Sequence, residues 1–205
     1  MLKFEGMILS VIYVVLGFAV CSIFVSITAD KFCGRKLLHI LMANWWFIRL
    51  RYMSEHLLIL GPLLFVIINS VYSYKKDSGN MGMPLFAVAL SIFSFATVFD
   101  DKYLLPSTIA VLVLGYADSG AALAGRIYQK KNKLEFKKSS VGLIAFFLIT
   151  VVTVVAVLGE YHEQFHTVKI ICFSLFLACS ERWIFPKYDN LVVPLIAFFL
   201  FYKFY

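Results

Sequence analysis

The sequence predicts an all-α fold, a polytopic integral membrane bundle of about eight transmembrane helices that forms a single domain over residues 1–205. Hydrophobic residues make up 61% of the chain and charged residues only 15%, whereas a soluble domain carries about 25% charged residues. The apolar residues come in long blocks, as membrane helices require. Because the loops between the blocks are short, we expect any chemistry to take place in the bilayer or at its surface.

Eight apolar segments approach the length of roughly 17–25 residues that a spanning helix needs. The second is short, so a re-entrant segment is the alternative to a full span there. The first is too long for the apolar core of a signal peptide and lacks a convincing cleavage site, so we expect it to be retained. The segments cover residues 7–28, 37–50, 57–74, 84–99, 104–128, 141–158, 167–182 and 191–204.

The charges of the loops predict the orientation, because cytoplasmic loops are rich in Lys and Arg. The first loop, with Lys31, Arg35 and Lys36, is expected in the cytoplasm. The loop around Glu160 and Glu163 is expected outside, together with both termini. Arg49 and Arg51 also fall outside, which runs against the rule that cations collect on the cytoplasmic side. The most basic loop is also expected in the cytoplasm and carries Arg126, Lys130, Lys131, Lys133, Lys137 and Lys138 against Glu135.

Asp118 lies among small residues in the cytoplasmic half of the fifth segment. Hydrocarbon strongly disfavours a charged side chain, so a carboxylate kept there marks a functional-site candidate. Helical spacing places Gly115, Ala122 and Gly125 on the same face as Asp118. Such a bare face admits either a closely packed helix or a polyphosphate against the backbone, and both alternatives stay open.

Two further polar groups are expected on the cytoplasmic side. Arg35, Lys36 and His39 are spaced by three and four residues, so they share one helical patch, although cations that snorkel to the membrane surface show the same pattern. Glu181 closes the seventh segment. Asp189 and Asn190 precede the eighth, where either would also serve as a helix N-cap.

Carboxylates ringed by Lys and Arg suit a metal-bound polyphosphate. Mg²⁺ takes one or two carboxylates together with phosphate oxygens, and cations stabilise the charge on a transferring phosphoryl group. Because such a site would face lipid, we expect the acceptor to be a lipid as well.

Four sequence elements extend this interpretation over about residues 35–205. They are Arg35-Lys36-Leu37-Leu38-His39-Ile40, the stretch from Gly115 to Arg126 with Asp118 at its acidic position, Lys138-Ser139-Ser140-Val141-Gly142 followed by Ala145-Phe146-Phe147, and Glu181 followed by Asp189-Asn190-Leu191-Val192-Val193-Pro194. In this order they resemble the CTP-dependent polyprenol kinase family, which includes dolichol kinase, phytol kinase and CTP-dependent diacylglycerol kinase. The chain departs from the family at Val141 and Leu143, where members often carry an acidic residue and a serine.

The resemblance implies a membrane kinase that transfers the terminal phosphoryl group of CTP, with Mg²⁺, to the hydroxyl of a polyprenol, another isoprenoid alcohol or diacylglycerol. The CTP preference rests on the resemblance alone. The resemblance assigns catalysis to Asp118, His39 and Asp189, metal binding to Asp118 and Glu181, a further site position to Asn190, and nucleotide binding to Arg35, Lys36, Gly125, Arg126, Lys138, Ser139 and Gly142.

Two alternatives have weaker support. The segment from His162 to His166 fits the zinc motif H-E-x-x-H of metalloproteases, but it falls in a short polar loop without an obvious third ligand. A small proton- or cation-coupled transporter would place Asp118 near the membrane midplane and often contains inverted repeats, and the sequence shows no repeat.

The expected partners follow from the charge. The net charge of +7 lies largely in the predicted cytoplasmic loops, so it suits anionic headgroups or a nucleotide rather than nucleic acid. We therefore expect a nucleotide, a lipid alcohol and the bilayer as partners. The chain is expected in the cell (inner) membrane of a bacterium or in the endoplasmic reticulum membrane of a eukaryote.

Overall fold

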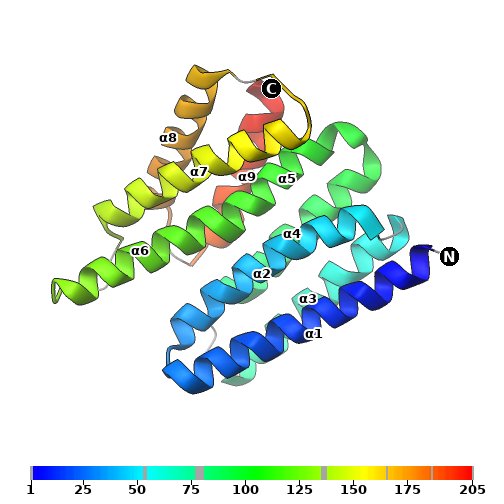
Figure 1. Cartoon of the computed structure of the whole chain (residues 1–205), viewed down its shortest axis with the longest axis horizontal. Coiled ribbons are helices and arrows are strands. Elements are labelled where there is room, and N and C mark those ends of the chain that lie inside the picture. Colours follow the sequence, from blue (N-terminus) through cyan, green and yellow to red (C-terminus); the bar gives the residue numbers. More distant parts are fainter. Residues whose placement is uncertain are drawn as a thin grey trace.

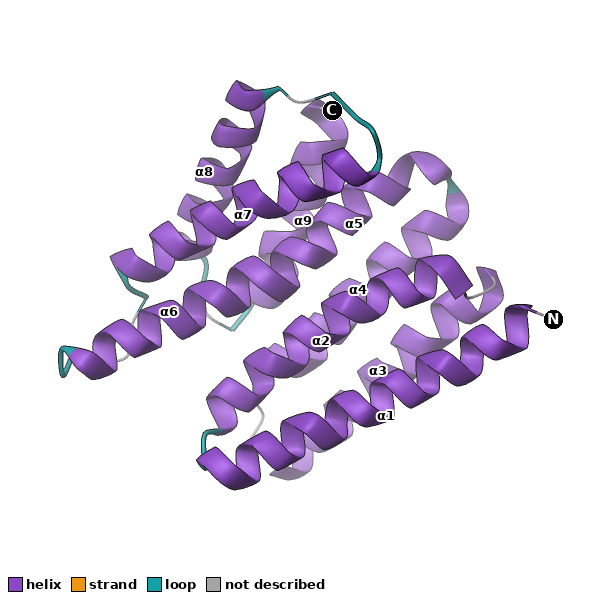
Figure 2. Ribbon diagram, in the orientation of Figure 1, coloured by secondary structure: helices purple, strands orange, loops and turns teal. Residues whose placement is uncertain are grey.

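The computed structural model describes residues 2–52, 55–76, 81–134, 138–164, 166–185 and 187–204. Every regular element in these ranges is helical (Figure 1, Figure 2), which confirms the all-α prediction. The elements are α1 (Leu2–Thr28), α2 (Lys31–Tyr52), α3 (Glu55–Lys76), α4 (Gly82–Phe99), η1 (Asp101–Tyr103), α5 (Leu104–Leu112), η2 (Val113–Ala117), α6 (Asp118–Lys131), α7 (Ser140–Glu160), α8 (Thr167–Trp183) and α9 (Asp189–Phe204).

Each of the eight predicted apolar segments lies within a helical stretch, and the fifth runs through α5, η2 and α6. The helix that contains the second segment is longer than the segment itself. Helix α2 has 22 residues, so at a rise of 1.5 Å per residue it is about 33 Å long, comparable to a hydrocarbon core of about 30 Å. It extends beyond residues 37–50 at both ends.

Among the residues that the structure describes, four helical stretches are both long and apolar enough to cross a membrane: Glu5–Thr28, Gly82–Phe99, Asp101–Lys131 and Ser140–Glu160. Large apolar side chains cover their outer faces; Val15 in α1 is 60% exposed and Val152 in α7 is 67% exposed. A soluble protein rarely exposes apolar surface on this scale. These four stretches therefore have the length and the apolar surface expected of an integral membrane protein.

Successive helical stretches run antiparallel, with α5, η2 and α6 forming one continuous stretch, so their ends alternate between the two ends of the bundle (Figure 1). At one end, which we call the cavity end, α2, α4, α7 and α9 begin and α6 and α8 finish. An ion pair of 3.1 Å between Arg126 of α6 and Asp30 before α2 lies there. At the opposite end Lys169 Nζ donates to the Phe204 carbonyl at 2.9 Å, and both chain termini lie at that end in Figure 1.

Helix α2 packs against η2 so closely that only glycine fits at position 115. A Cβ added to Gly115 would lie 2.2 Å from Ala43 Cβ and 3.2 Å from the His39 carbonyl oxygen. The Trp46 indole N–H also donates to Thr108 Oγ1 of α5 at 3.0 Å. This close approach places the start of α2 beside α6 at the cavity end.

Arg49, expected with Arg51 at the external end of the second segment, lies at the end of α2 opposite the cavity end but is fully buried. Its Nη2 donates to the Ser94 carbonyl at 3.1 Å and to Thr97 Oγ1 at 2.6 Å, both in the last turns of α4. The negative end of a helix stabilises a cation placed there. Arg49 therefore binds α2 to α4, whereas Arg51 is exposed.

Gly115→Ala is expected to lower the free energy of unfolding by about 1–3 kcal/mol, the usual cost of overpacking. The control is Gly61→Ala in α3, where the added Cβ would meet the Trp45 ring at an ordinary 3.5 Å. The control should be neutral or gain up to about 1 kcal/mol from the better helix propensity of alanine. Thermal unfolding of both variants in detergent measures the difference, and equal effects would contradict this packing account.

Candidate functional site

A cavity of about 430 Å³ opens at the cavity end, between the starts of α2, α4, α7 and α9 and the ends of α6 and α8. All the site residues predicted from the sequence line it, although they come from four separate sequence elements. Their chemical roles stay predictions. The residues are Arg35, Lys36, His39, Asp118, Gly125, Arg126, Lys138, Ser139, Gly142, Glu181, Asp189 and Asn190.

Three carboxylates form the centre of the site. Asp118 is the first residue of α6, Glu181 lies in the last turn of α8, and Asp189 is the first residue of α9. One oxygen from each lies within 4.8 Å of the others. Carboxylate oxygens are hard ligands of the kind that Mg²⁺ takes, usually one or two of them together with phosphate oxygens. Asp189, predicted as catalytic, is thus grouped with the two residues predicted as metal ligands.

Lys36 of α2 neutralises one of the three carboxylates. Its Nζ lies 2.5 Å from Asp118 Oδ2, and the two side chains are only 14% and 11% exposed. Charge-assisted hydrogen bonds of this kind are short and strong. The pair joins α2 to α6 across the cavity.

Lys138 neutralises the other two carboxylates. Its Nζ lies 2.9 Å from Glu181 Oε1 and 3.6 Å from Asp189 Oδ2. The same ammonium donates to the Glu181 carbonyl and, at 3.1 Å, to the Ile184 carbonyl. These carbonyls lie at the end of α8, so Lys138 also caps that helix.

The environment of Asp189 disfavours the charged form of its carboxyl. Burial of the Asp189 carboxyl, together with the nearby Asp118 carboxylate, raises the pKa of Asp189 to about 6, although Lys36 and Lys138 act in the opposite direction. Asp189 precedes the apolar run of α9, so this carboxyl lies at the end of the bundle. At this carboxyl desolvation therefore outweighs the two lysines.

Two buried polar side chains line the cavity with atoms that have no hydrogen-bond partner in the described part of the chain. His39 is 3% exposed and stacks on Phe86 at a ring-centroid distance of 4.2 Å, with neither ring nitrogen bonded. Asn190 is 5% exposed; its Nδ2 donates to the Gly82 carbonyl at 2.9 Å, whereas its Oδ1 has no partner. Buried polar atoms are nearly always satisfied, so water or a ligand in the cavity would complete the hydrogen bonds of both side chains.

Ser139, Gly125 and Gly142 have a structural role beside the predicted nucleotide contact. Ser139 Oγ accepts the Gly142 N–H at 3.0 Å and forms the N-cap of α7. A Cβ on Gly125 would lie 2.9 Å from that hydroxyl oxygen. The two glycines thus let α6 pass close to the start of α7, which forms one wall of the cavity.

The small-residue face around Asp118 is divided between packing and the cavity. The element directly before Asp118, η2, is a π-helical turn, a rare feature that often occurs at functional sites. Gly115 within it packs against α2, whereas Asp118, Ala122 and Gly125 line the cavity. The sequence pattern predicts a regular helix here, so the π turn was not predicted.

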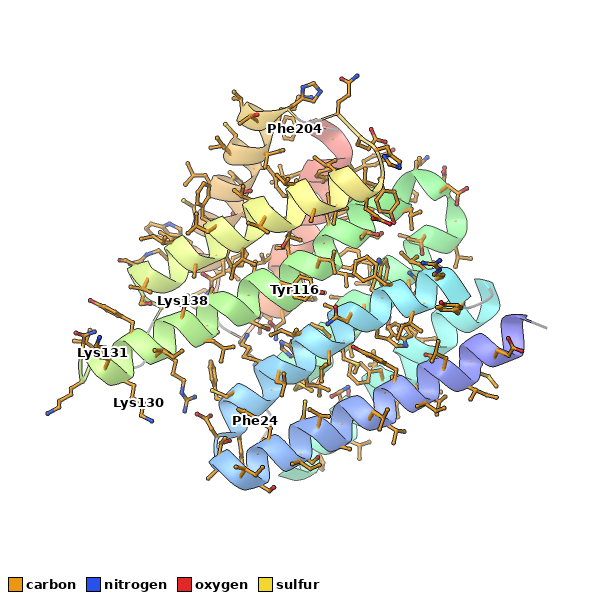
Figure 3. All side chains as sticks on the ribbon, in the orientation of Figure 1. Phe24, Tyr116, Lys130, Lys131, Lys138 and Phe204 are labelled. Atoms are coloured by element: carbon orange, nitrogen blue, oxygen red, sulfur yellow. The ribbon has the colours of Figure 1, made fainter. Side chains whose placement is uncertain are left out.

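The basic loop contributes less to the cavity than its charge predicted. Lys130 and Lys131 lie exposed at the outer end of α6 (Figure 3). Glu135 and Lys137 lie outside the described residues. The cations that line the cavity are Arg35, Lys36, Arg126, Lys138 and Arg182.

Several cavity residues were not predicted. Arg182 lies next to the predicted Glu181, which was the only local signal for it. Gly82 was hidden because its contact with Asn190 joins residues 108 apart in the chain. The other unpredicted lining residues are Phe32, Met83, Ala121, Gln129 and Leu143.

The H-E-x-x-H motif lies at the opposite end of the bundle, in the connection between α7 and α8. Zinc binding by this motif needs a helix that places both histidines on one face. In the described residues His162 lies in a turn with φ of 55° and Glu163 follows outside any helix, while Phe165 is not described. The described residues of the motif therefore do not form the helix that a metalloprotease needs.

No protein-family model, no curated protein and no solved structure matched the chain in the comparisons.

Proposed function

We propose that this protein is a membrane lipid-alcohol kinase that transfers the terminal phosphoryl group of CTP, with Mg²⁺, to the hydroxyl of a polyprenol, another isoprenoid alcohol or diacylglycerol. The cavity end would face the cytoplasm, with eight helical segments crossing the bilayer and both termini outside. The resemblance to CTP-dependent polyprenol kinases supports the choice of donor and acceptor.

The observation that carries the proposal is the combination of charges in one cavity. Asp118, Glu181 and Asp189 lie within 4.8 Å of one another, and five Lys and Arg side chains line the same cavity. A purely cationic pocket would suit a free anion, and a purely acidic one a free cation. The mixture suits a polyphosphate that carries a divalent ion.

The metal fits the residues that are present. The three carboxylates supply oxygen ligands, and Asn190, whose buried Oδ1 has no partner among the described residues, lines the same cavity. Asp118, Glu181 and Asp189 would hold Mg²⁺, with Asn190 beside them. When bound, the metal would neutralise phosphate charge and orient the phosphoryl group.

The other charged and polar residues of the cavity would bind the phosphates and accept the proton. Arg35, Arg126 and Arg182 would bind phosphate oxygens and stabilise the charge on the transferring group. The acceptor oxygen would attack the terminal phosphorus as the bond to the bridging oxygen breaks, so that CDP leaves. His39, whose ring nitrogens are both unbonded in the described structure, would accept the hydroxyl proton.

The position of the cavity supports a lipid acceptor. It opens at the end of a bundle whose outer faces are apolar, and Phe32, Met83 and Leu143 line it beside the charged groups. An alcohol on a long apolar chain would therefore bring its hydroxyl to the phosphates while the chain stays in the bilayer. A transporter that uses Asp118 as an ion site does not account for the five cations around it.

Asp118→Asn is expected to reduce phosphoryl transfer by roughly 10²–10³-fold, the cost typical of removing a group that stabilises the transition state electrostatically. The substitution keeps the size of the side chain but removes the charge that would hold Mg²⁺. The measurement is the rate of lipid-alcohol phosphorylation as Mg²⁺ and CTP are varied, on protein whose thermal unfolding shows that it is folded.

The matched control for this prediction is Asp101→Asn, which removes an exposed carboxylate at the opposite end of the bundle and should leave the rate unchanged. Near-normal turnover by a folded Asp118→Asn variant would exclude Asp118 as a metal ligand.

The topology makes a separate prediction. In a chain without its four native cysteines, Asn132→Cys and Glu163→Cys should react with membrane-impermeant reagents from opposite faces, because the exposed residues 132 and 163 lie at opposite ends of the bundle. Labelling of intact vesicles and of opened vesicles measures this. Reaction of both cysteines from the same face would contradict the eight-span topology.

A further inference from the structure

We propose that Lys36 is an exchangeable counter-ion of the metal site. It neutralises Asp118 while no divalent cation is bound, and it gives up this carboxylate to the metal and turns to a phosphate oxygen when the metal–nucleotide complex binds. The phosphate half of this exchange rests on the proposed kinase function. The competition between Lys36 and the metal does not.

The two lysines of the site are held differently. Lys138 is fixed by two carbonyls at the end of α8 as well as by Glu181, so it cannot leave without uncapping that helix. Lys36 bonds to Asp118 Oδ2 at 2.5 Å, and no other hydrogen bond or ion pair of Lys36 is seen among the described residues. Lys36 is therefore the cation that can be exchanged without disturbing a helix end.

Lys36 and a metal ion would compete for the same carboxylate. The Lys36 ammonium lies 2.5 Å from Asp118 Oδ2, and Mg²⁺ would bind a carboxylate oxygen at about 2.0–2.1 Å. Two cations this close repel strongly in a site that is largely shielded from water. Divalent binding to the three carboxylates therefore requires Lys36 to move.

The structure with Lys36 on Asp118 leaves other polar atoms unsatisfied. Asn190 Oδ1 and both ring nitrogens of His39 are buried at the cavity without a hydrogen-bond partner in the described residues. Lys36 thus compensates the charge of Asp118 but does not complete the site. A metal beside Asn190 and a substrate beside His39 would satisfy these atoms, so the carboxylates are a ligand site and not only a structural cluster.

The exchange predicts that metal and nucleotide bind together. A metal ion that arrives alone would displace Lys36 into a largely buried position without an anionic partner, which is unfavourable. A metal ion that arrives with a polyphosphate would supply that partner. Lys36 would therefore keep the carboxylates from binding free divalent ions and couple metal binding to nucleotide.

The test is the affinity of the purified full-length protein for Mn²⁺ alone, measured by electron paramagnetic resonance without nucleotide. Lys36→Met and Lys36→Gln are expected to bind Mn²⁺ at least about tenfold more tightly than the native protein, because a competing positive charge is removed. The matched control is Lys102→Met, which removes a lysine paired with Asp100 at 2.9 Å but half exposed, at the opposite end of the bundle. It should bind Mn²⁺ as the native protein does.

Adding Asp118→Asn to Lys36→Met should abolish the gain, because the gain depends on the carboxylate that Lys36 releases. A merely structural Lys36 would change thermal unfolding without raising the Mn²⁺ affinity. Unchanged or weaker Mn²⁺ binding by folded Lys36→Met and Lys36→Gln would overturn the exchange, as would a gain that persists in the double variant. If the gain is found but the native protein transfers no phosphoryl group, the exchange stands and the proposed kinase function fails.

Discussion

The arrangement of the cavity end depends on the repulsion among three carboxylates, which has to be balanced inside a helical bundle. Asp118, Glu181 and Asp189 come from α6, α8 and α9 and have oxygens within 4.8 Å of one another. The cations that balance them, Lys36 and Lys138, come from α2 and from the residues just before α7. One electrostatic centre therefore joins four helices and the segment just before α7. The same residues are the ones that would hold a divalent ion in the proposed function, so the packing of the cavity end and the proposed site use the same side chains.

Most of the helical framework was predictable because it follows from apolar block length. Each of the eight segments lies within a helical stretch, since a chain in hydrocarbon has to satisfy its backbone hydrogen bonds internally. The start of α2 was not predictable in this way, because Lys36 lies before the apolar run yet stays helical while it pairs with Asp118 of α6. The π turn before Asp118 was missed for a similar reason: the packing of Gly115 against Ala43 involves a helix more than 70 residues earlier in the chain.

Much of the candidate site could also be predicted, because loop charge placed its four sequence elements on one side of the membrane. The sequence does not reveal that some of the predicted site residues also have structural roles. Lys138 was expected at the nucleotide, yet it also caps α8, and Ser139 also caps α7. Both contacts depend on the packing of helices that are distant along the chain. The hydrogen bond from Asn190 to Gly82 could not be predicted. Its acceptor is a backbone carbonyl, which every residue has, so no local sequence pattern marks it.

The most direct test of the central claim is phosphoryl transfer by the purified protein in lipid micelles. The four nucleoside triphosphates, labelled at the terminal phosphate, would each be combined with polyprenol, phytol, farnesol and diacylglycerol, with and without Mg²⁺. Our account predicts a labelled lipid phosphate that forms from CTP in preference to the other donors and only with Mg²⁺. Folded protein that binds Mn²⁺ but labels no lipid from any donor would contradict it.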